Sequence, residues 1–370
     1  MNKTLNSDGR LLSLDAFRGI TMFLLAAEAS HIYRALGNAF SPTSIAGQFL
    51  VQFHHHAWNG LRFWDLIQPF FMFIVGVAMA YSIHKRLSMG DSWKNLGIHF
   101  ARRSVILFFL GVLLHCGYAQ ELRWELWNVL TQLSFTIMVT FAVLRMKVNT
   151  QILISFGLLL LTEILYRFSG VEGFDKPFVQ GQNFGSWMDM ILMGKINGGG
   201  WVAINALPTA AHTVWGMIVG NFLIREKSVQ KILKTLIIAG TAGLVLGYSM
   251  DWSGITPIIK RIATTSFVIT SGGWCLLSLA LLYWIVDLKG YNRWVIFFAI
   301  VGMNSIFIYM FSEVVVALWF DEYMEIFTGG FLGMIGAGET IINLVTAVCV
   351  LTVEWYLVYW LYKRKIFIRI

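Results

Sequence analysis

Residues 54 to 76 read HHHAWNGLRFWDLIQPFFMFIVG, and the architecture of the chain follows from this pattern. Polar and ionisable side chains stand directly before an apolar run that is long enough to enter a bilayer. Ionisable groups at a membrane boundary are energetically costly, so they usually mark a functional site. The simpler interpretation is an interfacial belt in which Trp58 and Trp64 anchor a helix at the lipid headgroups. We expect the chemistry of the protein in this segment.

The composition indicates a membrane protein along the whole chain. Hydrophobic residues make up 57% of the 370 positions and charged residues only 13%, whereas a soluble domain carries about 25% charged residues. Apolar runs of about 20 residues, the length of a membrane-crossing helix, recur throughout. We therefore predict an all-α, polytopic integral membrane protein with a single domain over residues 1–370.

The apolar runs predict about ten transmembrane helices. Their expected ranges are Leu14–Tyr33, Leu61–Ile83, Ser104–Tyr118, Leu126–Leu144, Ile152–Phe168, Val202–Ile224, Leu233–Met250, Thr264–Val286, Trp294–Phe320 and Glu339–Tyr362.

The positions of the basic residues predict which side of the membrane each loop faces. Most of the 28 lysines and arginines, including Lys3, Arg10 and Arg369, fall in alternate segments. By the positive-inside rule these segments and both termini are cytoplasmic, so the histidine segment faces outward. A minority, among them Lys260 and Arg261, falls on the outer side. The net charge of +8 resides in short loops and does not indicate binding to nucleic acid.

Cysteine usage and the start of the chain predict no disulfide framework and no cleaved leader. Cys116, Cys275 and Cys349 lie in or beside apolar runs and lack the CxxC spacing of a metal or redox site. The polar start of the chain leads into an apolar run that no small-residue cleavage site follows.

Polar side chains inside the other predicted helices are further site candidates. At about 1.5 Å per residue, Glu28 lies roughly 15 Å beyond Arg18 on the first helix, past mid-membrane. Arg18 can extend to the cytoplasmic interface or bind an anion that enters from the cytosol. Arg103 and Ser104 open the third helix, where they can contact phosphate, although ordinary positive-inside charge also explains the arginine. Asn304 is an amide in an apolar helix and can bridge two helices.

Four blocks of sequence occur in the order found in a known family. They are Ser13–Ile20; His55, Trp58 and Gly60 with Asp65–Phe70 and Phe73–Gly76; Arg103–Ser104 with Leu110–Gly111; and Asp287–Gly290 with Gly302–Ile306, Tyr309 and Glu313. Together they span most of the chain. The chain resembles the transmembrane acyltransferases typified by heparan-α-glucosaminide N-acetyltransferase. One departure is that Trp201–Pro208 replaces the acidic Pro-Glu-Gly segment of the family before the sixth helix.

The resemblance implies an enzyme that transfers acetyl from cytosolic acetyl-CoA to an amino sugar or another glycan acceptor on the outer side. The catalytic histidine of the family precedes the tryptophan by three positions, which selects His55. This imidazole can act as a general base or as a nucleophile. Glu28 is its expected partner, and Asn304 can polarise the thioester carbonyl.

The remaining candidates are contacts to the two substrates. They are Trp58, Asn59 and Asp65 for the acceptor, and Arg18, Arg103 and Ser104 for acetyl-CoA. Short outer loops with no large luminal domain predict a multi-pass protein of a bacterial inner membrane, with the lipid bilayer as a partner, and we expect no resident metal. The sequence leaves open whether the protein forms a homodimer.

Two rival interpretations follow from the same residues. A secondary transporter of a small solute would use Glu28 and Asn304 near mid-membrane, although no internal repeat is recognisable. A metal or haem site would use His54, His55 and His56, but adjacent histidines point in different directions on most backbones.

Overall fold

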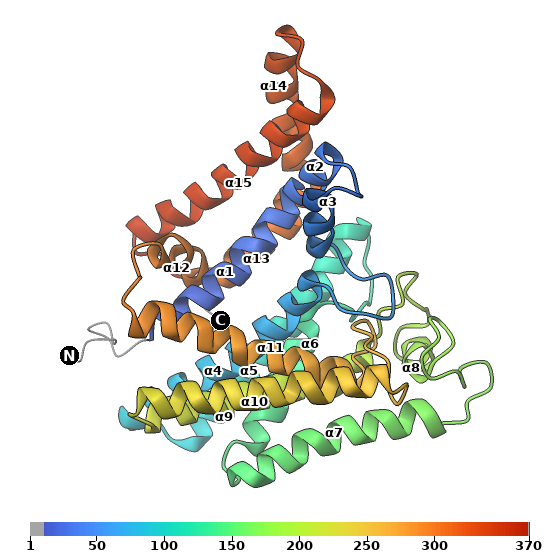
Figure 1. Ribbon diagram of the computed structural model, residues 1–370, viewed down its shortest axis with the longest axis vertical. Coiled ribbons are helices and arrows are strands. Elements are labelled where there is room, and N and C mark those ends of the chain that lie inside the picture. The colour runs from blue at the N-terminus through green and yellow to red at the C-terminus, as the bar shows by residue number, and fades with distance from the viewer. Residues whose placement is uncertain (1–10, 369) are drawn as a thin grey trace. The chain divides into compact units, whose positions relative to one another are not determined.

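The computed structural model describes residues 11–368 and 370, and within them the chain is all-helical, with no β-strand (Figure 1). The prediction of an all-α fold is thus confirmed. Lys3, Arg10 and Arg369, which contributed to the predicted topology, lie outside the described residues.

The chain separates into two compact units. Unit 1 comprises the described parts of Met1–His55, Arg62–Trp64 and Leu281–Ile370, and unit 2 comprises His56–Leu61 and Asp65–Ala280. The boundary passes through the histidine segment, since His55 and His56 belong to different units. That the two units work as one acyltransferase domain stays a prediction.

Unit 1 is organised around the close contact of α1 with α12. Its helices are α1 (Leu12–Ala29), α2 (Ile32–Ala39), α3 (Ile45–Leu50), η1 (Val51–Phe53), η4 (Tyr283–Leu288), α12 (Val295–Met303), α13 (Ser305–Phe311), η5 (Ser312–Phe320), α14 (Asp321–Met334) and α15 (Glu339–Lys363). A side chain at Gly19 would overlap the backbone of Phe298, and one at Gly302 would meet the backbone of Gly19. Glycine therefore permits the two helix backbones to touch, as is common between membrane helices.

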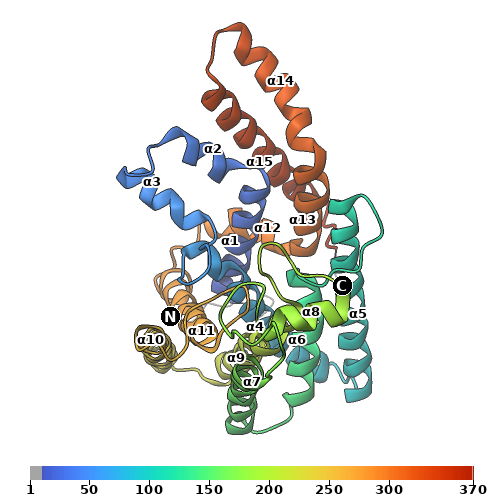
Figure 2. The same ribbon diagram turned by 90° about the vertical axis from the view of Figure 1, so that its right-hand side faces the viewer.

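Unit 2 is organised around the pair α4 and α9. Its helices are η2 (Phe63–Leu66, shared with unit 1), α4 (Ile67–Ser88), α5 (Trp93–Ala119), α6 (Val129–Val143), α7 (Val148–Phe168), α8 (Phe184–Met193), η3 (Ala203–Asn205), α9 (Ala206–Arg225), α10 (Val229–Trp252) and α11 (Thr265–Leu282). Gly76 lies against the backbone of Thr213, and Gly216 lies against that of Phe73. Helices α5 and α6 run side by side (Figure 2).

Seven helices of the described residues are long and apolar enough to cross a membrane, or eight if the bent pair α12 and Ser305–Met334 forms one span. Two further predicted spans do not meet this test. Helix α1 carries Asp15, Arg18 and Glu28 within its 18 residues, and α6 is an apolar helix of only 15 residues. The total of ten, and with it the cytoplasmic placement of both termini, therefore stays a prediction.

Two predicted helices end or break where polar residues interrupt them. The first was expected to reach Tyr33, but α1 stops at Ala29, and His31 adopts a left-handed φ of 61° before α2. The ninth was expected to be continuous over Trp294–Phe320, but it is broken at Asn304, where the two parts are bent by 78°. The first helix thus ends before the predicted Tyr33, and the ninth is divided at Asn304.

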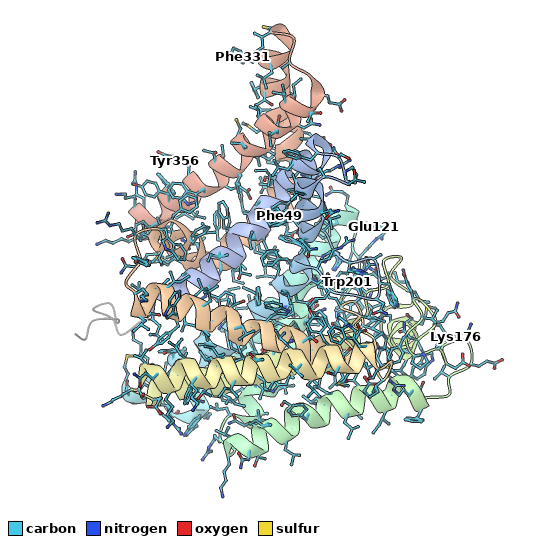
Figure 3. The ribbon with its side chains drawn as sticks, viewed as in Figure 1. Phe49, Glu121, Lys176, Trp201, Phe331 and Tyr356 are labelled. Atoms are coloured by element: carbon cyan, nitrogen blue, oxygen red, sulfur yellow. The ribbon has the colours of Figure 1, made fainter. Side chains whose placement is uncertain are left out.

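Several helices present apolar side chains outward, as a lipid-exposed surface requires. Only 22% of the most apolar window of α7 and of α10 is buried, compared with 78% for the span that contains α4. Exposed aromatics such as Phe331 and Tyr356 project from α14 and α15 (Figure 3). A soluble protein rarely exposes so much apolar surface. We conclude that the chain is a multi-pass membrane protein.

We expect Gly76→Ala to lower the free energy of unfolding by about 1–3 kcal/mol, because its methyl group would overlap the backbone of Thr213 in α9. Gly157→Ala in α7 is the matched control, since no atom lies within 4 Å of its added Cβ; a gain of up to about 1 kcal/mol is expected from helix propensity. Thermal unfolding of the purified variants in detergent measures the difference. Equal melting temperatures would contradict the close packing of α4 on α9.

The predicted topology can be tested with single cysteines in a background that lacks the three native ones. Cysteines at Thr43 and Lys176, both exposed, should react with a membrane-impermeant thiol reagent applied to intact cells, whereas one at exposed Ser88 should not. The reason is that the first two lie in predicted outer loops and the third in an inner loop. Labelling of position 88 from outside would overturn the outward orientation of His55.

Candidate functional site

The backbone around His55 is fixed by hydrogen bonds within unit 1. The Arg62 guanidinium donates from Nη1 to the His55 carbonyl oxygen at 3.0 Å. The backbone N–H of Phe63 donates to Gln52 Oε1 at 3.3 Å. These contacts join the chain on both sides of the histidine segment, while the His55 side chain remains partly exposed. A held backbone with an accessible imidazole suits a catalytic residue.

Glu28 and Trp64 form a polar contact in the same unit. The Trp64 indole donates from Nε1 to Glu28 Oε1 at 3.0 Å, and Tyr33 lies edge-on to the Trp64 ring and stacked on Phe53. The sequence predicted histidine as the partner of Glu28 and did not foresee the indole. Trp64 is only 2% exposed, which argues against the interfacial-belt interpretation for this residue.

Asn304 joins the break between α12 and α13 to the chain that follows α15. Its Nδ2 donates to the Ile366 carbonyl at 3.1 Å, and its Oδ1 accepts from the Ile368 N–H at 2.8 Å. The side chain is fully buried. The bridging role that the sequence allowed is therefore visible, with a chain segment as partner rather than a helix.

Arg18 and Glu28 lie near opposite ends of α1. Arg18 is partly exposed, and it precedes Gly19, the point of contact with α12. This arrangement agrees with separate roles for the two charges, one for each side of the membrane.

Arg103 and Ser104 lie on α5 in unit 2, near other basic groups of the predicted inner side. Ser104 is buried and Arg103 is partly exposed. Arg86, at the end of α4, pairs with Asp91 at 3.2 Å and approaches His99 of α5 at 3.5 Å. The sequence analysis did not identify Arg86 or His99 as candidates. Their proximity depends on how the turn between α4 and α5 folds.

Asp65 connects the histidine segment to a distant loop of unit 2. Its Oδ2 accepts from the backbone N–H of His56 at 3.2 Å, and its Oδ1 lies 3.9 Å from Lys260 Nζ. Asp65 is 1% exposed and Lys260 is 7% exposed. Burial of one charge in the other's absence would be costly, so this pair stabilises the connection only while both members are present.

Trp58 lies against the loop that precedes α9. Its indole Nε1 donates to the Phe178 carbonyl at 2.8 Å, and its ring contacts Gly200, where a Cβ would overlap it. Gly200 also has a φ of +79°, which favours glycine. Asn59 is exposed beside Trp58. The indole of Trp58 is thus fixed, while its amide neighbour is free to meet a substrate.

The structure assigns the predicted site residues to the two units as follows. Unit 1 contains Arg18, Glu28, His55 and Asn304, and unit 2 contains Trp58, Asn59, Asp65, Arg103 and Ser104. Sequence reasoning missed Trp201, Lys260 and Arg261 as neighbours of Asp65 and Trp58. A signal was present, because two adjacent basic residues on the predicted outer side run against the positive-inside rule.

Among residues 11–368 and 370, no three histidine, cysteine, aspartate or glutamate side chains converge as ligands for a metal ion. A metal or haem site on His54, His55 and His56 therefore finds no support.

Comparison with known proteins shows which enzymes the chain is similar to. No family model matches the chain. It is 26% identical to heparan-alpha-glucosaminide N-acetyltransferase of Homo sapiens over 98% of this chain and 60% of that protein. It is 23% identical to the enzyme of the same name from Mus musculus over 99% of this chain and 61% of that protein. The chain thus spans about 60% of the length of these relatives. The chain is a distant relative of heparan-alpha-glucosaminide N-acetyltransferase along nearly its whole length.

Proposed function

We propose that the protein is a transmembrane acetyltransferase. It takes acetyl from cytosolic acetyl-CoA and delivers it to an amino sugar or another glycan acceptor on the outer side of a bacterial inner membrane. The observation that carries this proposal is the relationship, over nearly the whole chain, to two proteins named heparan-alpha-glucosaminide N-acetyltransferase. The candidate histidine and the helices long enough to cross a membrane support it.

The reaction has to join two substrates that lie on opposite sides of a membrane. CoA is a large anion that stays in the cytosol, so only its pantetheine arm and thioester need to enter the protein. Arg103, Ser104 and Arg18 are the proposed contacts to the CoA phosphates, because guanidinium groups bind phosphate through two parallel hydrogen bonds. The acetyl group can then reach the outer side while CoA does not cross.

His55 is the proposed catalytic residue, and two routes use it. As a general base it would accept a proton from the acceptor amine while the nitrogen attacks the thioester carbonyl and the CoA thiolate leaves. As a nucleophile its ring nitrogen would displace the CoA thiolate, and the acceptor would then take acetyl from the acetyl-imidazole. Arg62 supports either route, since it holds the His55 carbonyl.

The other proposed residues assist transfer. Glu28 would orient His55 or stabilise its protonated form. Asn304 would polarise the thioester carbonyl. Trp58, Asn59 and Asp65 would contact the acceptor. Assembly as a homodimer stays a prediction.

A secondary transporter is the second candidate, and one observation favours it. The bend of 78° between α12 and Ser305–Met334 resembles the broken helices that form substrate sites in transporters. The two functions differ in whether a thioester bond is broken. Purified protein supplied with acetyl-CoA and glucosamine should release free CoA thiol and N-acetylated sugar. Uptake of a solute by proteoliposomes without any loss of thioester would favour the transporter.

We expect Arg103→Ala to weaken acetyl-CoA binding about tenfold or more, because a hydrogen bond to a charged group contributes about 1.5–3 kcal/mol. Arg18→Ala should act in the same direction. The neighbouring Arg102, which is exposed, provides the matched control. Calorimetric titration of the folded variants gives the affinities. Equal affinities in Arg103→Ala, Arg18→Ala and Arg102→Ala would reduce these arginines to ordinary positive-inside charge.

We expect His55→Ala to lower acetyl transfer at least about 100-fold while CoA still binds, since general base catalysis contributes that much or more. His54→Ala and His56→Ala should lose far less. The wild-type rate should rise with pH as histidine loses its proton, because both routes need the neutral imidazole. Transfer by the His55 variant within a few fold of wild type would refute the assignment. Similar loss in all three variants would indicate a structural cluster instead.

A further inference from the structure

Two cationic side chains flank one tryptophan in unit 2. Lys260 Nζ lies 5.2 Å and Arg261 Cζ lies 5.8 Å from the centre of the Trp201 ring. Both cations come from the connection between α10 and α11, and Trp201 lies among the loops that join α7, α8 and α9 (Figure 3). Cations over an indole ring are attracted to it, which holds the three side chains together.

The two cations differ in how their charge is compensated. Lys260 lies beside the Asp65 carboxylate. Arg261 donates from Nη1 to the Gly199 carbonyl, and within the described part of the chain no carboxylate forms an ion pair with it. Its Nε is buried and, among residues 11–368 and 370, has no hydrogen-bond acceptor. A buried donor of this kind is costly and calls for a specific explanation, such as a ligand oxygen.

Asp189 is an acidic group that holds this stretch of loop, and its oxygens are already engaged. Asp189 of α8 accepts from the Ala203 N–H at 2.9 Å and from Trp127 Nε1 at 2.7 Å. Burial raises its pKa to about 6, and it is fully enclosed. Asp189 therefore fixes the chain next to Trp201 through hydrogen bonds and leaves Arg261 without an acidic partner.

The loop around Trp201 is held in one conformation before any ligand arrives. Gln180 Nε2 donates to the Gly198 carbonyl at 3.0 Å, and Asn205 Nδ2 donates to the Arg261 carbonyl at 3.3 Å. Gly200 packs against Trp58, a predicted acceptor contact. A preorganised site loses less entropy on binding, and here it adjoins a residue that the sequence already assigned to the acceptor.

We propose that Arg261, with Lys260 beside it, binds an oxyanion carried by the sugar acceptor, a carboxylate or a phosphate group. Arg261 would contact two oxygens through its guanidinium, including Nε, and Lys260 would add a second positive charge. This assignment rests on the proposed function for the identity of the acceptor. It also explains why two adjacent cations are retained on the predicted outer side, against the positive-inside rule.

A purely structural role is the competing explanation, in which both cations serve only to fix Trp201. The two explanations differ in ligand binding. The full-length protein in detergent is titrated by calorimetry, without acetyl-CoA, with glucosamine 6-phosphate and with glucosamine. We expect wild type to bind the phosphorylated sugar at least about tenfold more tightly, as one charge-assisted pair contributes, and inorganic phosphate to compete with it.

Variants test whether Arg261 causes the preference for the phosphorylated sugar. In Arg261→Gln the affinity for glucosamine 6-phosphate should fall to that for glucosamine, and Arg261→Lys should retain part of the preference because it keeps the charge. Lys176→Gln, an exposed lysine of the same outer region, is the matched control and should retain all of it. Melting temperatures verify folding, and Lys260→Gln is the second variant if Arg261→Gln does not fold.

Two results would overturn the anion site: equal affinity of wild type for both sugars, or a preference that survives in Arg261→Gln and Lys260→Gln. Failure of the proposed function would look different. A preference that depends on Arg261, together with no acetyl transfer to either sugar, would leave the anion site standing and reject the transferase. Transfer that depends on His55 without any preference for the phosphorylated sugar would reject the anion site alone.

Discussion

The absence of water in the hydrocarbon core of a bilayer is the constraint on which the rest of the structure depends. Each backbone N–H and C=O in that layer needs a partner within the chain, so an all-helical fold is the form that these apolar runs can take. The same constraint drives charged groups to helix ends or into pairs. Arg18 and Glu28 lie near opposite ends of α1, and the buried Asp65 has Lys260 beside it. Polar chemistry is thereby concentrated where helices begin, end or break.

The helical architecture was predictable because apolar runs of membrane length carry their own signal. Helix α4 and the broken ninth helix show what such a signal predicts and what it does not. The apolar run of α4 is enough to predict a helix, because the backbone hydrogen bonds of a helix join residues close in sequence. The break at Asn304 depends on hydrogen bonds to Ile366 and Ile368, which are more than 60 positions away, and no local pattern indicates such a partner. Likewise, α1 ends at Ala29 because His31 adopts a left-handed φ of 61° and turns the chain, a conformation that the pattern of apolar residues does not encode.

The candidate site was predictable in its residue types and only partly in its partners. The spacing of His55 and Trp58 and the resemblance to a family identified the segment before its surroundings were visible. Trp64 as the partner of Glu28, and Trp201 with Arg261 near Trp58, depend on how loops fold back over distances that sequence periodicity does not encode. The Lys260–Arg261 pair could have been noticed, because adjacent cations on the predicted outer side are an exception to the positive-inside rule.

The central claim is that acetyl crosses the membrane through the protein while CoA does not. The most direct measurement uses sealed proteoliposomes with acetyl-CoA, radiolabelled in the acetyl group, enclosed on the predicted cytoplasmic side and glucosamine supplied only on the other. The account predicts labelled N-acetylglucosamine outside, free CoA inside in equal amount, and no CoA outside. Labelled product that forms only when acetyl-CoA and the sugar are on the same side would contradict it.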